Sequence, residues 1–220
     1  MNDALPPVLH ADDWLLVVDK PSGMLSVAGR GPAGEDCLHA RLRRSWPDAM
    51  VVHRLDMATS GLMVFARGER AQRTLSTAFA DRAVDKRYVA IVAGKPEPAH
   101  TDDGGWAAID LPLAADWPAR PRQKVDAVNG RRSLTRWRRA REARSELNGG
   151  TRLELQPVTG RSHQLRVHLA AIGHPILGDA LYAPGPTAHA APRLLLHAQC
   201  LALAHPADGR PLAWRCDAPF

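Results

Sequence analysis

Runs of apolar residues alternate with polar turns along most of this 220-residue chain, and their lengths predict a mixture of strands and helices. The first run, residues 14–19, has the length of a buried strand, and Pro21 and Gly23 turn the chain sharply after it. Residues 95–130 are rich in proline, glycine and charge, so loops are expected to dominate there. The further strands that the pattern predicts cover residues 62–66, 87–93, 133–141, 151–156, 194–203 and 212–215.

Helical periodicity marks three segments between these strands. Residues 36–46 and 69–83 carry apolar side chains about one helical turn apart. In the second segment four residues are expected to share a face: Leu75, Ala78, Phe79 and Arg82. A third helix is expected to follow Ser162, its N-cap, and to end at Gly173. Its buried side chains are expected to be Leu165, Leu169 and Ile172.

The order of these elements bears on the fold class. Strands and helices do not alternate regularly, and Asn148-Gly149-Gly150 between two predicted strands is typical of a hairpin turn. The pattern therefore favours an α+β fold over a doubly wound parallel sheet. At this length one or two domains are possible.

Composition indicates the class of protein and the compartment in which it is expected to work. Hydrophobic residues make up 45% and charged residues 24% of the chain, as in ordinary soluble globular proteins. No apolar run approaches the ~20 residues that span a bilayer, and the amino terminus lacks the basic and apolar segments of a secretory signal. Three cysteines, Cys37, Cys200 and Cys216, are too few for a disulfide framework. A reduced, cytoplasmic setting is expected.

Positive charge is concentrated in one window. Between Arg120 and Arg144 there are ten Lys or Arg residues and two acids, so this window carries +8, the whole chain +6 and the remainder −2. Either a flexible solvated loop or a polyanion-binding patch would explain this, and the interleaved Trp117 and Trp137 favour a nucleic acid because indoles stack on unpaired bases. The RNA-binding candidates in the window are Arg131, Arg132, Arg138 and Arg139.

Candidate chemistry centres on residues 52–62. Asp56 stands in a short polar turn, two residues after Arg54 and shortly before the apolar run at 62–66. Catalytic groups often sit on turns that a scaffold fixes in place, but an aspartate beside an arginine is also a common local ion pair or Asx-turn. The residues alone leave both readings open.

The whole segment resembles the HRLDxxTSGLLVFA signature of the RluA family of RNA pseudouridine synthases, residue for residue through HRLD and TSGL. Further elements resemble the family's motifs in the family's order, so the resemblance covers essentially the whole chain. They are KPSG at residues 20–23 with Leu25 and Ser26, RYVA at 87–90, TGRSHQLRVH at 159–168 and GHPILGD at 173–179.

The resemblance implies an α+β pseudouridine synthase catalytic fold, a mixed and mostly antiparallel bifurcated β-sheet with flanking helices and loops. Many relatives carry an additional amino-terminal S4 RNA-binding domain. Because KPSG begins at Lys20, residues 1–220 are expected to form a single catalytic domain without one. The reaction consumes no redox equivalent or group donor, so no cofactor is expected. His163 and His168 are poorly spaced as a metal pair, so no metal site is expected.

The resemblance also assigns roles to single residues. Asp56 matches the catalytic aspartate, which acts as nucleophile, as base or as counter-charge at the sugar. Arg161 matches the arginine that pairs with it, and Tyr88 the active-site tyrosine. Arg54 matches the arginine that fills the space left by an extruded nucleotide. From its place in the third helix, Arg166 is a candidate phosphate contact.

The substrate expectation comes from Asp116–Val125 and Arg193–Ala198, which resemble a dual-specificity subgroup acting on 23S ribosomal RNA and tRNA anticodon stem-loops. Residues 131–144 depart from that pattern by being more basic. The protein is expected to be a monomer that binds RNA and no membrane. Two alternatives compete with this expectation: a non-catalytic RNA-binding or ribosome-assembly protein on the same fold, and a carboxylate-dependent glycosidase or nucleoside hydrolase. The latter needs a second acid, and none stands near Asp56 in the sequence.

Overall fold

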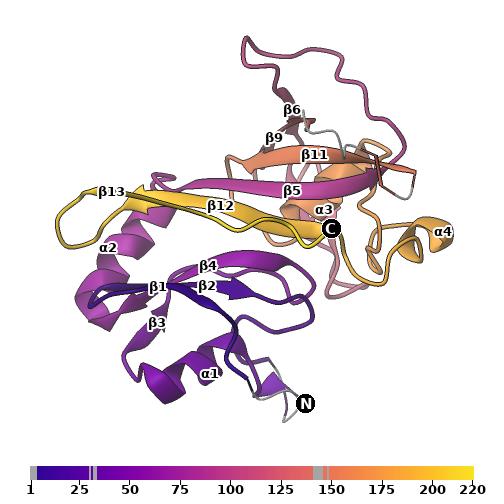
Figure 1. The fold of residues 1–220 in the computed structure, drawn as a ribbon. Helices are drawn as coiled ribbons and strands as arrows, with labels where there is room; N and C mark the ends of the chain where they lie inside the picture. Colours follow the sequence, from indigo (N-terminus) through magenta and orange to yellow (C-terminus); the bar gives the residue numbers. More distant parts are fainter. Residues whose placement is uncertain (1–3, 30, 32–33, 141–145, 148) are drawn as a thin grey trace. The chain divides into compact units, whose positions relative to one another are not determined.

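The computed structural model describes residues 4–29, 31, 34–140, 146–147 and 149–220 (Figure 1). Arg141, Glu142 and Arg144 of the basic window and Asn148 of the expected hairpin turn lie outside the described residues. The helices are α1 (Leu38–Ser45), α2 (Gly68–Ala80), α3 (Gln164–Ala171) and α4 (Gly185–Ala188). The strands are β1 (Val8–Ala11), β2 (Leu15–Lys20), β3 (Ala49–Val51), β4 (Ser60–Arg67), β5 (Asp85–Ala93), β6 (Ala107–Asp110), β7 (Leu113–Ala115), β8 (Gln123–Val125), β9 (Leu134–Arg139), β10 (Glu146–Leu147), β11 (Gly150–Pro157), β12 (Leu196–Ala204) and β13 (Pro211–Arg215).

The chain divides into two compact units. The first contains residues 1–86 and 197–219, and the second contains residues 87–196 and Phe220. No helix among the described residues is long and apolar enough to cross a membrane.

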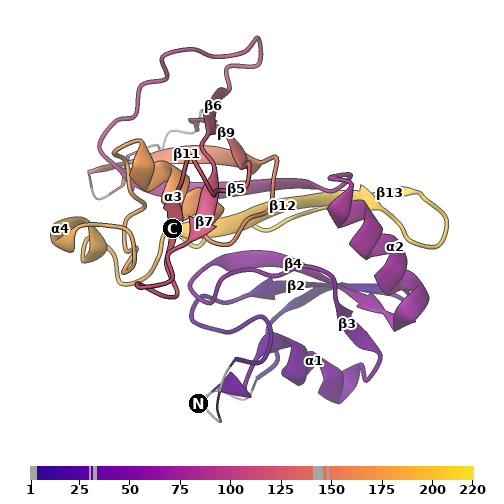
Figure 2. The same cartoon turned by 180° about the vertical axis from the view of Figure 1, so that it is seen from behind.

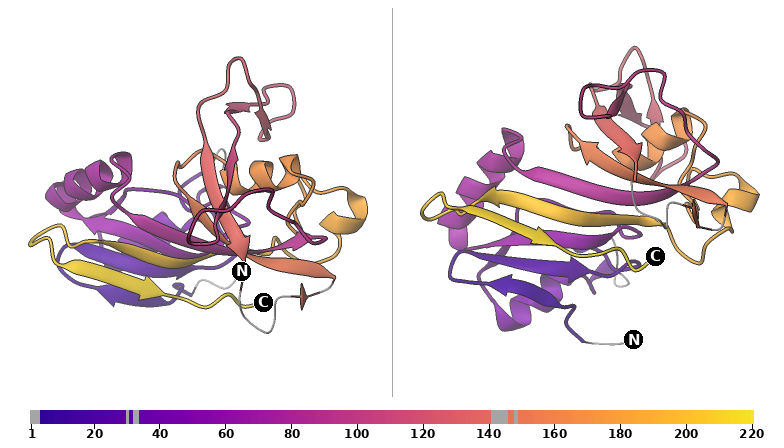
Figure 3. Two further views of the ribbon diagram at one scale, coloured as in Figure 1. Left: turned by 90° about the horizontal axis from the view of Figure 1, so that it is seen from above. Right: turned by 45° about the horizontal axis from the view of Figure 1, so that its top comes forward.

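In the first unit the strands follow the order β1-β2-β4-β12. β2 runs antiparallel to β4, with Leu16 opposite Phe65, while β12 joins β4 in parallel through His197 opposite Ser60. β3 also pairs with β4, and β13 returns along β12 as a long hairpin, yellow in Figure 3.

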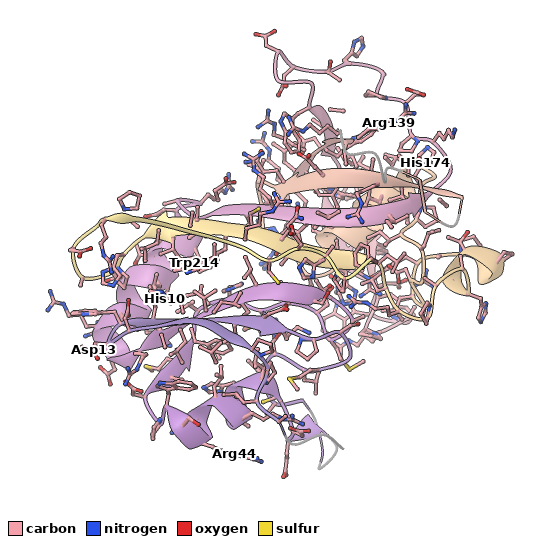
Figure 4. All side chains as sticks on the ribbon, in the orientation of Figure 1. His10, Asp13, Arg44, Arg139, His174 and Trp214 are labelled. Carbon is pink, nitrogen blue, oxygen red and sulfur yellow. The ribbon has the colours of Figure 1, made fainter. Side chains whose placement is uncertain are left out.

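Both faces of β2 and β4 are buried, which explains why their sequences are continuous apolar runs rather than alternating ones. One face carries Leu15 and Val17 of β2 and packs with Leu75 of α2 in the unit's hydrophobic core. On the other face the ring of Phe65 stacks on His39 of α1, with centroids 6.1 Å apart. At the sheet edge Trp214 of β13 meets His10 of β1 edge-on at 5.3 Å (Figure 4).

In the second unit the strands follow the order β5-β11-β9-β6, all antiparallel, and β7 and β8 form a separate hairpin (Figure 2). β11 is central, with Leu153 and Leu155 fully buried. α3 packs near β8, β9 and β11 and buries Leu165 and Leu169 as expected, whereas Ile172 is only half-buried.

The α+β class and its mostly antiparallel strands are thus confirmed, and three expectations need correction. Arg82 does not share the face of α2, because the helix ends at Ala80 and Arg82 is an exposed residue at φ 62°. The N-cap of α3 is His163, not Ser162. Six short strands were not predicted: β1, β3, β6, β7, β8 and β10.

Candidate active site

Asp56 lies on a tight turn of the first unit. The Thr59 amide donates to the Asp56 carbonyl at 3.0 Å, closing a four-residue turn just before β4. Asp56 is half-buried, while Arg54 and Met57 on either side are exposed. The carboxylate and the neighbouring guanidinium are therefore presented from one short, hydrogen-bonded segment.

The KPSG segment holds this turn in place. Lys20 is fully buried at the end of β2, and its ammonium donates to the carbonyls of Pro21 at 2.9 Å, Met24 at 2.8 Å and Met57 at 3.1 Å. The Ser22 hydroxyl donates to the Ala58 carbonyl at 2.7 Å, and the Gly23 amide to the Met57 carbonyl at 2.8 Å. Two motifs that are separate in sequence are therefore joined by hydrogen bonds between their loops.

Two further contacts fix the approach to Asp56. The Ser26 hydroxyl donates to the Leu55 carbonyl at 2.7 Å and lies 3.2 Å from the Leu55 amide, which donates to it. Nε2 of His53 accepts from the Val64 amide at 3.0 Å, and its ring stacks on Phe79. Burial, and secondarily the charge of Lys86, lowers the pKa of His53 to about 3. His53 is thus a neutral structural acceptor that helps to shape the turn.

The residues after the turn are fixed by β12. The Ser60 hydroxyl lies 2.9 Å from Nδ1 of buried His197, whose Nε2 lies 3.0 Å from the Cys216 carbonyl. His197 therefore accepts from Ser60 and donates to Cys216. Gly61 has φ +109°, and a Cβ there would lie 2.3 Å from the Ala198 carbonyl oxygen. Only glycine permits this close parallel pairing.

One group of side chains among the described residues has the spacing of a metal site: ligand atoms of Asp19, His197 and Cys216 lie within 4.8 Å of one another. The group does not suit a metal ion. Both ring nitrogens of His197 are already hydrogen-bonded. Burial and the hydrogen bond that its thiol donates to Asp19 raise the pKa of Cys216 to about 11, so it is a thiol and not the thiolate that metals bind.

The other candidate residues belong to the second unit. Tyr88 is half-buried on β5, opposite Leu155 of β11. Arg161 is exposed on the turn before α3, with its Nε 3.4 Å from the Arg132 carbonyl. Asp56 lies in the first unit, so its pairing with Arg161 stays a prediction.

Buried Gln164 organises the Arg161 turn. Its side-chain oxygen accepts from the Thr159 hydroxyl at 2.7 Å and from the Arg161 amide at 3.0 Å. Its amide nitrogen donates to the Leu134 carbonyl and the Thr135 hydroxyl, both at 3.0 Å. Every hydrogen-bonding group of this side chain faces the turn or β9, which fixes where Arg161 leaves the backbone.

Tyr182 adds a second support. Its hydroxyl accepts from the Gln123 backbone amide at 2.8 Å and forms a hydrogen bond with Nδ1 of His163 at 2.6 Å. His163 has a left-handed backbone, φ 54°, which is uncommon for a non-glycine residue. Tyr182 thus ties the β7–β8 hairpin to the strained residue that begins α3.

The side chain of Arg166 is paired with a buried carboxylate, that of Asp179. Arg166 is 4% exposed, and its Nε and Nη2 donate to both carboxylate oxygens of Asp179 at 2.8 and 2.7 Å. A buried, bidentate pair is costly to break. The structure therefore favours a role in anchoring the GHPILGD segment over the phosphate contact that the sequence suggested.

His168 is buried as well. Its Nδ1 lies 2.9 Å from the Thr135 hydroxyl and its Nε2 2.9 Å from the Leu111 carbonyl. Burial lowers the pKa of His168. This histidine holds α3 to its neighbours.

Acidic side chains from outside the basic window pair with some of its arginines. Arg138 forms a double hydrogen bond with Glu154, at 2.8 and 2.6 Å, and Arg139 pairs with Glu97. By contrast, Arg131 is exposed, and the side chain of Arg132 is 79% exposed and only 3.8 Å from Asp110 at its closest. Of the four RNA contacts predicted in this window, Arg131 and Arg132 are therefore the two that are not held by a close ion pair among the described residues.

The molecule combines a mixed α+β scaffold with a carboxylate on an anchored turn and exposed arginines, which is typical of an enzyme acting on a nucleic acid. The RNA pseudouridylate synthase family model matches residues 14–171, and the chain belongs to that family. The RNA-uridine isomerase class predicted from the sequence is thereby confirmed.

Similar proteins agree over nearly the full length. The dual-specificity RNA pseudouridine synthase RluA of Escherichia coli K12 is 46% identical over 213 residues, covering 97% of this chain and 93% of its own. The protein of the same description from Vibrio vulnificus is 47% identical, covering 94% and 83%. Among solved structures, human RNA pseudouridylate synthase domain containing 1 has a TM-score of 0.77 at 26% identity, covering 99% of this chain and 85% of that one.

Four positioning residues were not identified as such from the sequence: Lys20, Ser26, Gln164 and Tyr182. The first three stand inside the recognised motifs, and a lysine at the junction of an apolar strand and a Pro-Gly turn was the available signal for Lys20. Nothing local marks Tyr182, because its partners lie 19 and 59 residues away in the chain.

Proposed function

We propose that this protein converts uridine to pseudouridine in structured RNA with Asp56 as the essential carboxylate. The observation that carries the proposal is the bracing of the Asp56 turn by buried Lys20 and by Ser26. Holding a reactive group in a fixed position supplies much of an enzyme's rate enhancement. A carboxylate that served only as a local turn former would not need supports from a second loop.

The reaction breaks the N1–C1′ bond of uridine, turns the uracil and joins its C5 to C1′. The C5 proton is lost and N1 becomes protonated, so the product is an isomer and no redox partner is required. Asp56 acts at the sugar, as nucleophile, base or counter-charge to the oxocarbenium ion. Arg161 orients it through charge-assisted hydrogen bonds.

The remaining roles follow the motif positions. Tyr88 stacks on the target base and assists removal of the C5 proton. Arg54 occupies the space of the extruded nucleotide, since an enzyme acting on a base must take it out of the stack and a planar guanidinium can replace it. We place the reaction in the cytoplasm, in a monomer without metal. The relatives' description as dual-specificity enzymes supports two substrate classes, 23S ribosomal RNA and tRNA anticodon stem-loops.

Tritium release from RNA containing [5-³H]uridine tests the proposal. The wild type should release tritium, and Asp56→Asn, which keeps the shape of the side chain, should abolish release. Asp13→Asn is the matched control, because the Asp13 side chain is 99% exposed. Release that survives in Asp56→Asn would refute the role of Asp56. Binding without release by the wild type would indicate a non-catalytic RNA-binding protein, and free uracil a hydrolase.

RNA contact through the basic window is tested with two double variants. Arg131→Ala/Arg132→Ala should weaken RNA binding and lower the slope of log affinity against log salt concentration by up to about 2. Arg138→Ala/Arg139→Ala should change that slope less, because these side chains are paired with Glu154 and Glu97. Equal effects of the two variants would contradict this division of the patch.

A further inference from the structure

Trp117 is the most exposed large aromatic side chain among the described residues. It is 67% exposed on the loop between β7 and β8, whereas Trp106 and Trp137 are 7% and 4% exposed and belong to the packing of their unit. The guanidinium carbon of Arg120 lies 3.3 Å from the Trp117 ring centroid. With one face covered by Arg120 and most of the residue exposed, the opposite face of the indole is open to solvent.

Backbone hydrogen bonds hold the loop that presents Trp117 in a defined conformation. The Asp116 amide donates to the Arg122 carbonyl at 3.0 Å, and the Arg122 amide to the Ala119 carbonyl at 3.0 Å. Pro118 and Pro121 restrict the backbone on both sides of Arg120. A preorganised loop loses little conformational entropy when it binds a ligand.

The base of the hairpin is also anchored. The Gln123 amide donates to the hydroxyl of Tyr182 at 2.8 Å, and the guanidinium of Arg122 lies 5.5 Å from the same ring. The Tyr182 hydroxyl in turn forms a hydrogen bond with His163, two residues after Arg161. The loop is therefore fixed to the turn that presents Arg161.

We propose that Trp117, backed by Arg120, is a stacking platform for an unpaired nucleobase of the RNA substrate. An indole offers a π-face to any base, and a guanidinium beneath it adds a positive charge for the neighbouring phosphates. Arg122 and Lys124 extend that charge along the hairpin. The proposal rests on the proposed function only in that the bound RNA is taken to be the substrate.

The test is a binding cycle between protein and RNA. The probe is a synthetic anticodon stem-loop RNA, together with versions in which one loop nucleotide at a time is replaced by an abasic residue. The proteins are wild type, Trp117→Ala, Trp117→Phe and Val128→Ala. Val128, 88% exposed after β8, is the matched control for loss of an exposed apolar side chain in the same hairpin region.

Trp117→Ala should weaken binding by about 5- to 150-fold, the range found for removing one base–aromatic stack. Trp117→Phe should lose less, because it keeps a ring, and Val128→Ala should match the wild type. One abasic RNA should weaken wild-type binding by a similar factor and Trp117→Ala binding hardly at all. That non-additivity would identify the stacked base.

Two results would overturn the proposal: Trp117→Ala binding as tightly as Val128→Ala, or losses that add at every abasic position. Because the readout is affinity, it is independent of catalysis. Absence of tritium release from the wild type would refute the proposed function and leave the stacking result standing on its own.

Discussion

Replacing Lys20 by methionine tests whether the KPSG segment positions the proposed catalytic aspartate. Methionine keeps most of the aliphatic stem of this fully buried side chain and removes the ammonium. Three carbonyls then lose the ammonium as a donor, those of Pro21, Met24 and Met57, and the Met57 carbonyl keeps the Gly23 amide. Only the Met57 carbonyl lies on the Asp56 turn. Loss of that bond is expected to affect the position of Asp56, whereas loss of the bonds to Pro21 and Met24 is expected to affect the stability of the fold.

The expected loss of stability follows from two opposing terms. A carbonyl left without a donor costs roughly 1–3 kcal/mol, so the Pro21 and Met24 carbonyls together cost at most about 6 kcal/mol. Water can replace part of this loss at Pro21, which is an exposed residue. Removing a buried ammonium relieves a desolvation penalty that also amounts to several kcal/mol. We expect a net loss of about 2–4 kcal/mol in the free energy of unfolding, because the bonds in place are short and charge-assisted. A displacement of the turn by about 1 Å should lower kcat by roughly 100-fold.

Urea unfolding and tritium release measure the two effects separately, with Lys95→Met as the control for the same substitution at an exposed lysine. Release is measured at a temperature where both variants are fully folded. If Lys20→Met matched Lys95→Met in both assays, the bracing argument would be refuted. A loss of stability with unchanged kcat would mean that Lys20 supports the fold but does not position Asp56.

Three further outcomes are expected. Gly61→Ala should destabilise the protein by at least about 3 kcal/mol, because its Cβ would meet the Ala198 backbone, whereas Gly23→Ala, also at positive φ but in open space, should cost about 1 kcal/mol in thermal or urea unfolding. The folded-state pKa of His53, about 3, lies below its ordinary value of 6.5, so its contribution to stability is complete above pH 6.5 and is lost as the pH falls toward 3. The loss is about 2 kcal/mol at pH 5, and His53→Gln should remove that part of the pH dependence of urea unfolding. Tyr182→Phe removes one donor and one acceptor, so it should lower thermal stability by about 1–2 kcal/mol and reduce kcat more than it changes KM; equal kcat would contradict its positioning role.

The sequence predicted the long elements because their apolar patterns are decisive. The strand at residues 14–19 and the helix at 69–83 appear as β2 and α2 with small changes at their ends. The missed strands have two to four residues each, too short for a period to be read, and β6, β7 and β8 lie in the Pro- and Gly-rich region where loops are expected. Their pairing is decided by tertiary partners rather than by local propensity.

Motif residues were predicted better than the network that supports them. Asp56 stands on a turn, as its surroundings indicated, but the bonds from Lys20 and Ser26 span 37 and 29 residues of chain. The start of α3 shows the same difficulty. Ser162 fits the rule for N-caps, yet the buried side chain of Gln164 holds the Arg161 amide, and the helix begins at His163 in a left-handed conformation. The Gln164 side chain is itself fixed by the Leu134 carbonyl and the Thr135 hydroxyl, 30 and 29 residues away, so tertiary contacts outweighed a local preference.

The basic window illustrates why charge counted along a chain differs from charge presented to a ligand. The acid that pairs with Arg139 lies 42 residues earlier, and the acid that pairs with Arg138 lies 16 residues later, so neither belongs to the window. A paired guanidinium at a protein surface has less to gain from a phosphate, because it must give up a carboxylate to bind one. Phosphate contacts from this window are therefore expected at Arg131 and Arg132 and along the Trp117 hairpin, where exposure and not sequence density selects the residues.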